Sequence, residues 1–242
     1  MPIHDWTRVD AGTYHDFHQV WTIEIRNALN RGILPPGYSA FADLKVSGAE
    51  PDVATIQTRP VPVGGGLAVA DSPPRARKIS RLPWEGSSYA RKANRIVIRH
   101  RRGQLIAALE VVSPGNKDSR NGITAFVGKV VDFLHNGIHV VMIDPFPAGP
   151  RDPAGLHALV WDEMDGPAVE PPPADKPLLV VAYEAGGELT AYTDSLAIGD
   201  EWPDTPLFLA PGWYVNLPLA RTYAAAWDET PQDTRDLLIP PA

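Results

Sequence analysis

The chain has 242 residues, of which 44% are hydrophobic and 21% charged, with a mean hydropathy of −0.17. This composition suffices for a sizeable buried core and excludes an intrinsically disordered protein. The sequence has no cysteine, which excludes disulfides, thiolate metal sites and cysteine nucleophiles, so any metal must have oxygen or nitrogen ligands. No apolar run reaches the roughly 18 residues that span a bilayer, and residues 1–8 contain no apolar secretion signal, so we expect a cytoplasmic protein with no membrane partner.

The first part of the chain predicts a helix, two strands and a long insertion. Apolar residues recur at steps of three and four over 13–31, which indicates an amphipathic helix that ends at Gly32. β-branched and aromatic residues between turn formers predict strands at 38–46 and 52–58. From 59 to about 94 the chain is rich in Pro, Gly, Ser and Arg, which is typical of an insertion.

The central part of the chain has an α/β pattern. Residues 95–100 and 104–112 predict a β-hairpin around a short Arg-Arg-Gly turn. A second amphipathic helix is predicted at 119–136, and a short apolar strand at 139–143. A strand, a helix and a strand joined by short links are typical of a parallel crossover.

The C-terminal part is rich in proline. Residues 145–177 contain nine prolines, so we expect no regular element there. Residues 178–183 and 188–193 predict another hairpin. For the tail we expect aromatic-rich loops and one short helix near 217–227.

These elements predict one domain over 1–242 of the α/β class, with a mixed β-sheet flanked by helices. Its core covers about 13–144 and is interrupted by the basic insertion at about 59–94. The proline-rich part, 145–242, is expected to pack on this core as an elaboration.

Basic residues are concentrated in one segment. The formal net charge is −7, yet residues 75–102 hold ten of the 22 basic residues and a single acid. Arginine forks beside aromatic rings suit phosphates and exposed bases, which predicts nucleic-acid binding. The alternative is a solvated hairpin that pairs with the acidic remainder of its own chain or of a second subunit in a homo-oligomer. The predicted nucleic-acid contacts are Arg75, Arg77, Lys78, Arg81, Arg91 and Lys92.

Two carboxylates stand in apolar strands. Glu110 lies within 105–112, where an unpaired carboxylate is costly and needs a cation. Asp52 begins the other apolar strand, so two adjacent strands can bring both carboxylates to one point. Two acidic ligands with retained waters suit Mg²⁺ or Mn²⁺, which can activate a water and stabilise a phosphoryl transition state. Lys129, or Lys117 as the competing candidate, is predicted to orient the nucleophile or phosphate, and a structural ion pair is the alternative for each.

Several short motifs are spread along nearly the whole chain. They are Ile3-His-Asp-Trp, Tyr14-His-Asp-Phe-His, Leu34-Pro-Pro-Gly-Tyr, Glu50-Pro-Asp-Val, Leu109-Glu-Val-Val-Ser-Pro-Gly-Asn-Lys and Gly137-Ile-His-Val-Val-Met-Ile-Asp. These motifs resemble those of one bacterial family, called domain of unknown function 4058. The central motifs are also similar to the Uma family of predicted restriction endonucleases in the PD-(D/E)xK superfamily.

The resemblance implies a restriction-endonuclease-like core and assigns its site residues. Asp52 would be the first metal ligand, Glu110 the second, Lys129 a lysine that has migrated to a helix, and Glu24 a further ligand. The chain departs from the pattern in two ways. Val112 stands where a lysine is usual, and a long insertion separates Asp52 from Glu110.

Two weaker candidates for function are a histidine pair and an aspartate. His15 and His18 share one face of a helix and could hold a metal with His4 or Asp5, although their aromatic neighbours favour an ordinary cluster of hydrogen-bonded histidines. Asp144 ends a strand, where α/β proteins often place functional groups, but Asp-Pro is also an ordinary exit into a turn.

The working hypothesis is Mg²⁺- or Mn²⁺-dependent phosphodiester hydrolysis. The alternative is a non-catalytic nucleic-acid or protein binding or assembly module that keeps the fold, which the valine at 112 favours. A third hypothesis is a self-associating structural protein whose exposed tryptophans and prolines form contacts between subunits.

Overall fold

The computed structural model describes five stretches of the chain: residues 1–42, 51–58, 74–83, 99–100 and 103–239. The predictions for Arg91 and Lys92 lie outside the described residues. So do the predicted strand residues 43–46 and 95–98, and the greater part of the predicted insertion.

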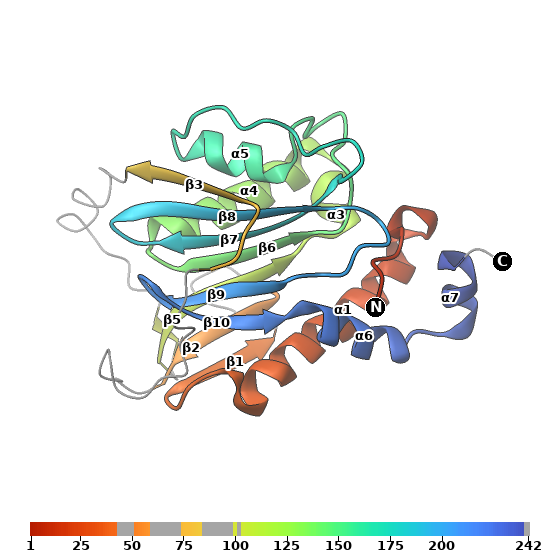
Figure 1. Cartoon of the computed structure of the whole chain (residues 1–242), viewed down its shortest axis with the longest axis horizontal. Helices are drawn as coiled ribbons and strands as arrows, with labels where there is room; N and C mark the ends of the chain where they lie inside the picture. The colour runs from red at the N-terminus through yellow and green to blue at the C-terminus, as the bar shows by residue number, and fades with distance from the viewer. Residues whose placement is uncertain (43–50, 59–73, 84–98, 101–102, 240–242) are drawn as a thin grey trace.

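A mixed β-sheet runs through the middle of the domain (Figure 1). Seven strands follow one another in the order β1-β2-β5-β6-β7-β8-β3, and the short β4 pairs with β5. β5 and β6 are parallel, whereas the other described pairs are antiparallel. The strands are β1 (Tyr38–Ala42), β2 (Val53–Gln57), β3 (Lys78–Pro83), β4 (Arg99–His100), β5 (Gly103–Val111), β6 (His139–Asp144), β7 (Leu178–Ala185) and β8 (Glu188–Leu196).

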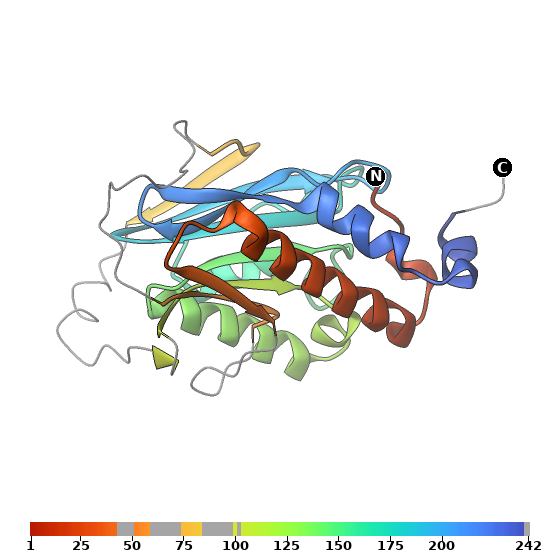
Figure 2. The same ribbon diagram turned by 90° about the horizontal axis from the view of Figure 1, so that it is seen from below.

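Each face of the sheet has its own hydrophobic layer (Figures 1 and 2). On one face lie α1 (Ala11–Ala28), α6 (Leu219–Asp228) and a separate hairpin of β9 (Asp204–Ala210) and β10 (Trp213–Pro218). On the other face lie α4 (Arg120–His135) and α5 (Leu156–Glu163). Among the described helices, none combines the length and the apolar character of a bilayer-spanning segment. The shorter helical elements are η1 (Trp6–Arg8), the π-helical turn η2 (Leu29–Ile33), α3 (Pro114–Lys117) and α7 (Gln232–Leu238).

The α/β class and a mixed sheet flanked by helices are confirmed. The helix predicted at 13–31 is α1 with its π-helical extension. Asp10 is the N-cap residue of α1, and its carboxylate accepts hydrogen bonds from two backbone N–H groups of the first turn. Its buried side recurs at helical spacing through Tyr14, Phe17, Trp21 and Ile25. The predicted crossover is also present, because β5, α4 and β6 follow one another with the two strands parallel.

The expectation of no regular element at 145–177 is wrong. Helix α5 occupies the middle of this segment and buries Leu156, Val160 and Trp161 against the sheet. The prolines of the segment flank this helix and none lies within it, so they limit its length without preventing it. The number of prolines in the whole segment does not reveal that eight consecutive residues without proline are enough for α5.

The expectation of loops through most of the tail is wrong as well, although the short helix near 217–227 is confirmed as α6. The hairpin β9–β10 packs on the same face of the main sheet as α1 and α6, with β9 against β5, β6 and β7. Five consecutive residues of β9 are buried, so this strand lacks the alternation of polar and apolar residues that marks a half-exposed strand.

Part of the predicted insertion also belongs to the sheet. β3 forms its far edge through antiparallel pairing with β8. Its side chains are largely exposed, as is usual for an edge strand, so its sequence gives little hydrophobic signal.

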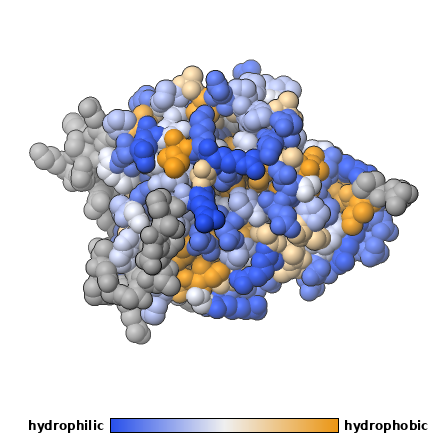
Figure 3. Space-filling view, viewed as in Figure 1, coloured by the Kyte–Doolittle hydropathy of each residue, from blue (hydrophilic) through white to orange (hydrophobic). Residues whose placement is uncertain are grey.

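Tryptophan side chains lie mostly inside the domain, contrary to the expectation of exposed tryptophans. Of the six described, five are at most 4% exposed, and they pack with Tyr14, Phe17 and Tyr223 or with the α4–α5 layer. Apolar groups on the surface are scattered, and the most exposed, Leu237 and Ile239, lie at the end formed by α7 (Figure 3). Trp213 is the one described tryptophan that is partly exposed.

Candidate functional site

Asp52 and Glu110 come together where β2 begins and β5 ends. The two strands are antiparallel with Val53 opposite Leu109, so Asp52, one residue before β2, lies opposite Glu110. Oδ2 of Asp52 accepts a hydrogen bond of 2.7 Å from the backbone N–H of Val111. The long insertion between the two carboxylates therefore leaves them on neighbouring strands.

Lys129 reaches Glu110 from α4. Its Nζ lies 2.6 Å from Oε2 of Glu110, and the side chains are 25% and 2% exposed respectively. The other carboxylate oxygen, Oε1, is buried and has no hydrogen-bond partner. The site is thus exposed to solvent at Lys129 and buried at Glu110. One carboxylate oxygen of Glu110 makes no hydrogen bond.

The protonation of Glu110 is set by opposing effects. Burial is the largest effect and raises the pKa of Glu110, and the nearby Asp52 carboxylate raises it further. The Lys129 ammonium acts in the opposite direction, and the resulting pKa is about 8. Glu110 is therefore protonated near neutral pH in the free protein. A stronger cation than Lys129 is needed to keep it ionised.

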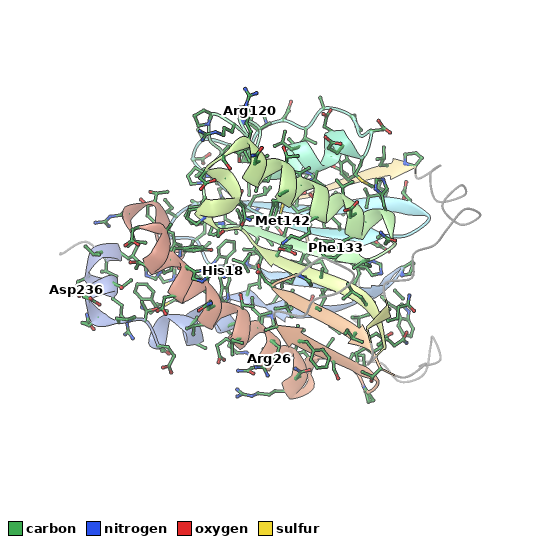
Figure 4. All side chains as sticks on the ribbon, turned by 180° about the vertical axis from the view of Figure 1, so that it is seen from behind. His18, Arg26, Arg120, Phe133, Met142 and Asp236 are labelled. Carbon is green, nitrogen blue, oxygen red and sulfur yellow. The ribbon has the colours of Figure 1, made fainter. Side chains whose placement is uncertain are left out.

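His18, predicted from the sequence only as a metal-binding partner of His15, is a further member of this site. Its Nε2 lies 3.2 Å from Oδ2 of Asp52 and 3.0 Å from the backbone oxygen of Val111. Both neighbours are acceptors, so Nε2 carries the proton that it shares with them. Figure 4 shows His18 on the side of α1 that faces the strands. This histidine thus fixes the orientation of the Asp52 carboxylate.

The sequence signal for His18 is its spacing from Tyr14. The two residues lie one turn apart on α1, and the Tyr14 hydroxyl donates a hydrogen bond of 3.0 Å to the backbone oxygen of Val112. Together they attach one face of α1 to the carboxyl end of β5.

Lys117 belongs to a different cluster. Its Nζ lies 2.9 Å from an oxygen of Asp144 and 2.9 Å from an oxygen of Asp152, and it also donates to the backbone oxygens of Phe146 and Pro147. Burial raises the pKa of Asp144 to about 6 against the lowering effect of Lys117. Lys117 therefore ties the end of β6 to the loop that follows, and Lys129 is the lysine that faces Glu110.

The remaining metal-ligand candidates are placed differently. Glu24 accepts a hydrogen bond from Asn27 on its own helix and lies six residues beyond His18, about 9 Å along the helix axis. His4 stacks on Trp227, with ring centroids 3.6 Å apart, and its Nδ1 lies 2.9 Å from the Tyr223 hydroxyl. Within the described stretches, no three His, Asp or Glu side chains form a group that could hold one metal.

The basic residues of 75–81 lie at the far edge of the sheet. β6, β7 and β8 separate β5 from β3, which corresponds to about 19 Å across the sheet. The backbone N–H of Arg77 donates to Asp194 and its guanidinium to the backbone oxygen of Ser195, while Arg81 lies 3.7 Å from Glu188. Arg75, Arg77, Lys78 and Arg81 are thus distant from Asp52 and Glu110, and two of them pair with acids of the same chain, as the alternative interpretation expected.

The donor set at Asp52 and Glu110 fits a hard divalent cation. Both side chains supply carboxylate oxygens, which Mg²⁺ and Mn²⁺ prefer, and two such ligands with retained waters are a usual complement for Mg²⁺. Oε1 of Glu110, buried and without a partner, is the kind of atom that a cation would satisfy. The residues present are therefore compatible with such an ion.

Comparisons with known proteins give no match. No protein-family model matches the chain, and neither a curated protein nor a solved structure matches it. The resemblance to domain of unknown function 4058 and to the Uma family stays a prediction.

The pKa of Glu110 predicts a pH dependence of stability without metal. The folded-state pKa of about 8 lies above the ordinary value of 4.5, so the contribution of Glu110 to stability is greatest below pH 4.5 and is lost as the pH rises through 8. We expect the free energy of unfolding of the native protein to fall relative to that of Glu110→Gln between pH 5 and 8, as measured by urea denaturation with EDTA. A difference that does not change with pH would contradict the assigned environment of Glu110.

Proposed function

We propose that the protein is a Mg²⁺- or Mn²⁺-dependent phosphodiesterase with a restriction-endonuclease-like core. The observation that carries this proposal is the meeting of Asp52, Glu110 and Lys129 at one end of β2 and β5, since these residues come from distant parts of the chain. A carboxylate pair suits a divalent cation that can activate a water, and a lysine beside it can orient that water or the phosphate.

Each side chain has a separate role in this proposed centre. Asp52 and Glu110 hold the ion, and the bound ion supplies an activated water and charge neutralisation at the phosphate. The Val111 N–H and His18 keep Asp52 in place through its Oδ2. Lys129 donates a hydrogen bond to Glu110 in the free protein and, being a quarter exposed, can turn its ammonium to the substrate phosphate.

A second candidate is a non-catalytic nucleic-acid or protein binding or assembly module with the same fold. Two observations favour it: Lys129 already contacts Glu110 at 2.6 Å without a metal, and the basic residues of 75–81 lie about 19 Å across the sheet from this site. Such a module needs no affinity for divalent ions at Asp52 and Glu110, which separates the two candidates.

Titration with Mn²⁺ in a calorimeter tests the metal centre. We expect saturable binding to the native protein, with affinity at least about tenfold weaker in Asp52→Asn and in Glu110→Gln because each loses one carboxylate ligand. Asp132→Asn is the matched control, because it removes an exposed carboxylate from α4 itself and should leave the affinity unchanged. No saturable binding, or equal weakening in all three variants, would refute the metal centre and leave the non-catalytic module.

A further inference from the structure

A cleft of about 280 Å³ lies at the far edge of the sheet, away from Asp52 and Glu110. It is lined by β3 and β8 on one side and by α5 and the proline-rich segment 169–176 on the other. The apolar part of its wall comes from Ala154, Val169, Leu179 and the prolines 171–173, whereas the polar part comes from Arg77, Lys78, His157, Glu170, Lys176, Thr193 and Ser195.

One buried hydroxyl in this wall lacks a partner. Thr193 is 7% exposed, and its Oγ1 is buried and makes no hydrogen bond. Thr193 lies directly opposite Lys78 in the antiparallel pair of β3 and β8, so both side chains are on the face that α5 covers. A buried hydroxyl without a partner is costly, and a ligand in the cleft would satisfy it.

The cationic groups of the wall differ in how they are neutralised. Arg77 lies 3.9 Å from Asp194, and Lys176 lies 3.7 Å from Asp200. Among the described residues, no carboxylate lies within ion-pair distance of Lys78. Lys78 is therefore the cation that a bound anion would neutralise.

His157 adds a neutral polar group to the cleft. It is 3% exposed, and its Nδ1 lies 2.8 Å from the Tyr183 hydroxyl. Burial, and to a smaller extent the charge of Lys78, lowers the pKa of His157 to about 4, so the ring is neutral at physiological pH. With Nδ1 occupied, Nε2 is the ring nitrogen available to a ligand.

We propose that this cleft binds a small molecule that carries a phosphate or carboxylate group on a small apolar body. Lys78 neutralises the anionic group, Thr193 donates its hydroxyl hydrogen to it, and the prolines 171–173 with Val169 cover the apolar body. The volume lies near the lower limit of ligand pockets, about 300 Å³, which restricts the ligand to a small one. The site is independent of the proposed phosphodiesterase centre, because it lies at the other edge of the sheet and shares no residue with it.

Calorimetric titration with phenyl phosphate, benzoate and inorganic phosphate tests this site. We expect saturable binding of phenyl phosphate or benzoate, the tighter of the two identifying the anionic group, and weaker binding of inorganic phosphate, which lacks the apolar body. Lys78→Ala should weaken binding at least about tenfold, because a charged hydrogen bond is lost. Thr193→Val, which exchanges the hydroxyl for a methyl group of similar size, should weaken it in the same direction.

Arg75→Ala is the matched control, since Arg75 is an exposed cation on the same segment that does not line the cleft. It should leave the affinity unchanged, and Lys78→Ala, at an exposed position, should leave thermal unfolding nearly unchanged. Absence of saturable binding of both organic anions would overturn the proposal. Equal weakening by Arg75→Ala and Lys78→Ala would overturn it too, because it would indicate a general effect of charge.

Discussion

Replacing Lys117 by methionine is expected to lower the free energy of unfolding by about 3–5 kcal/mol at pH 8, the range for breaking a buried ion pair by removing one partner. The Lys117 side chain is 10% exposed, and the carboxylates of Asp144 and Asp152 are 4% and 1% exposed. Without the ammonium, two buried carboxylates would face each other and two backbone oxygens would lose a donor. Chemical denaturation followed by tryptophan fluorescence measures this loss.

The effect of Lys117→Met should depend on pH. The folded-state pKa of Asp144 is about 6 with Lys117 present, and it rises further without the ammonium. A carboxyl group whose pKa is raised by folding loses its stabilising contribution as the pH increases, so the variant should be least stable at pH 8 and recover part of its stability at pH 5. Lys176→Met, which breaks a more exposed pair, should cost less than about 1 kcal/mol at either pH. Similar losses in the two variants would contradict the description of a buried cluster.

The second large effect concerns catalysis. Lys129→Met should reduce metal-dependent phosphodiester cleavage by about 10²–10³-fold, the size of effect seen when one charge-stabilising donor is removed. Affinity for Mn²⁺ should be retained or increased, because the ammonium no longer competes for Oε2 of Glu110. Initial cleavage rates and Mn²⁺ calorimetry on the same preparations measure both quantities.

Arg120→Met serves as the control for Lys129→Met, since it removes an exposed cation from the first turn of the same helix (Figure 4). It should leave the cleavage rate and the Mn²⁺ affinity unchanged. Undiminished cleavage by Lys129→Met would show that this lysine has only a structural role.

Periodicity predicts the elements that have one buried face. α1 and α4 each bury one side, and their apolar residues recur at helical spacing. β9 is buried on both faces and therefore resembles an irregular apolar segment in sequence. β3 presents the opposite case, because its exposed side chains carry little hydrophobic signal, and its place in the sheet depends on pairing with β8 more than 100 residues later.

In the candidate site, too, some residues are predictable from local sequence and others depend on contacts between distant parts of the chain. Glu110 is conspicuous in sequence because a carboxylate in an apolar strand needs compensation, and the structure places Lys129 beside it. Asp52 and Glu110 meet because β2 and β5 pair, which the two apolar strands made foreseeable. His18 joins them through a helix–strand contact that spans 93 residues to Val111. Its spacing from Tyr14 marks a face of α1 but does not encode which strand that face contacts. The position of the basic residues of β3 likewise follows from the strand order and not from their charge.

The central claim is that Asp52, Glu110 and Lys129 form a metal-dependent phosphodiesterase centre. The most direct measurement incubates the native protein and Glu110→Gln with supercoiled DNA, single-stranded DNA and RNA, with and without Mn²⁺, and follows cleavage on gels. We predict cleavage of at least one substrate that requires Mn²⁺ and is lost in Glu110→Gln. Absence of Mn²⁺-dependent cleavage of all three substrates, or cleavage that Glu110→Gln retains in full, would contradict the account.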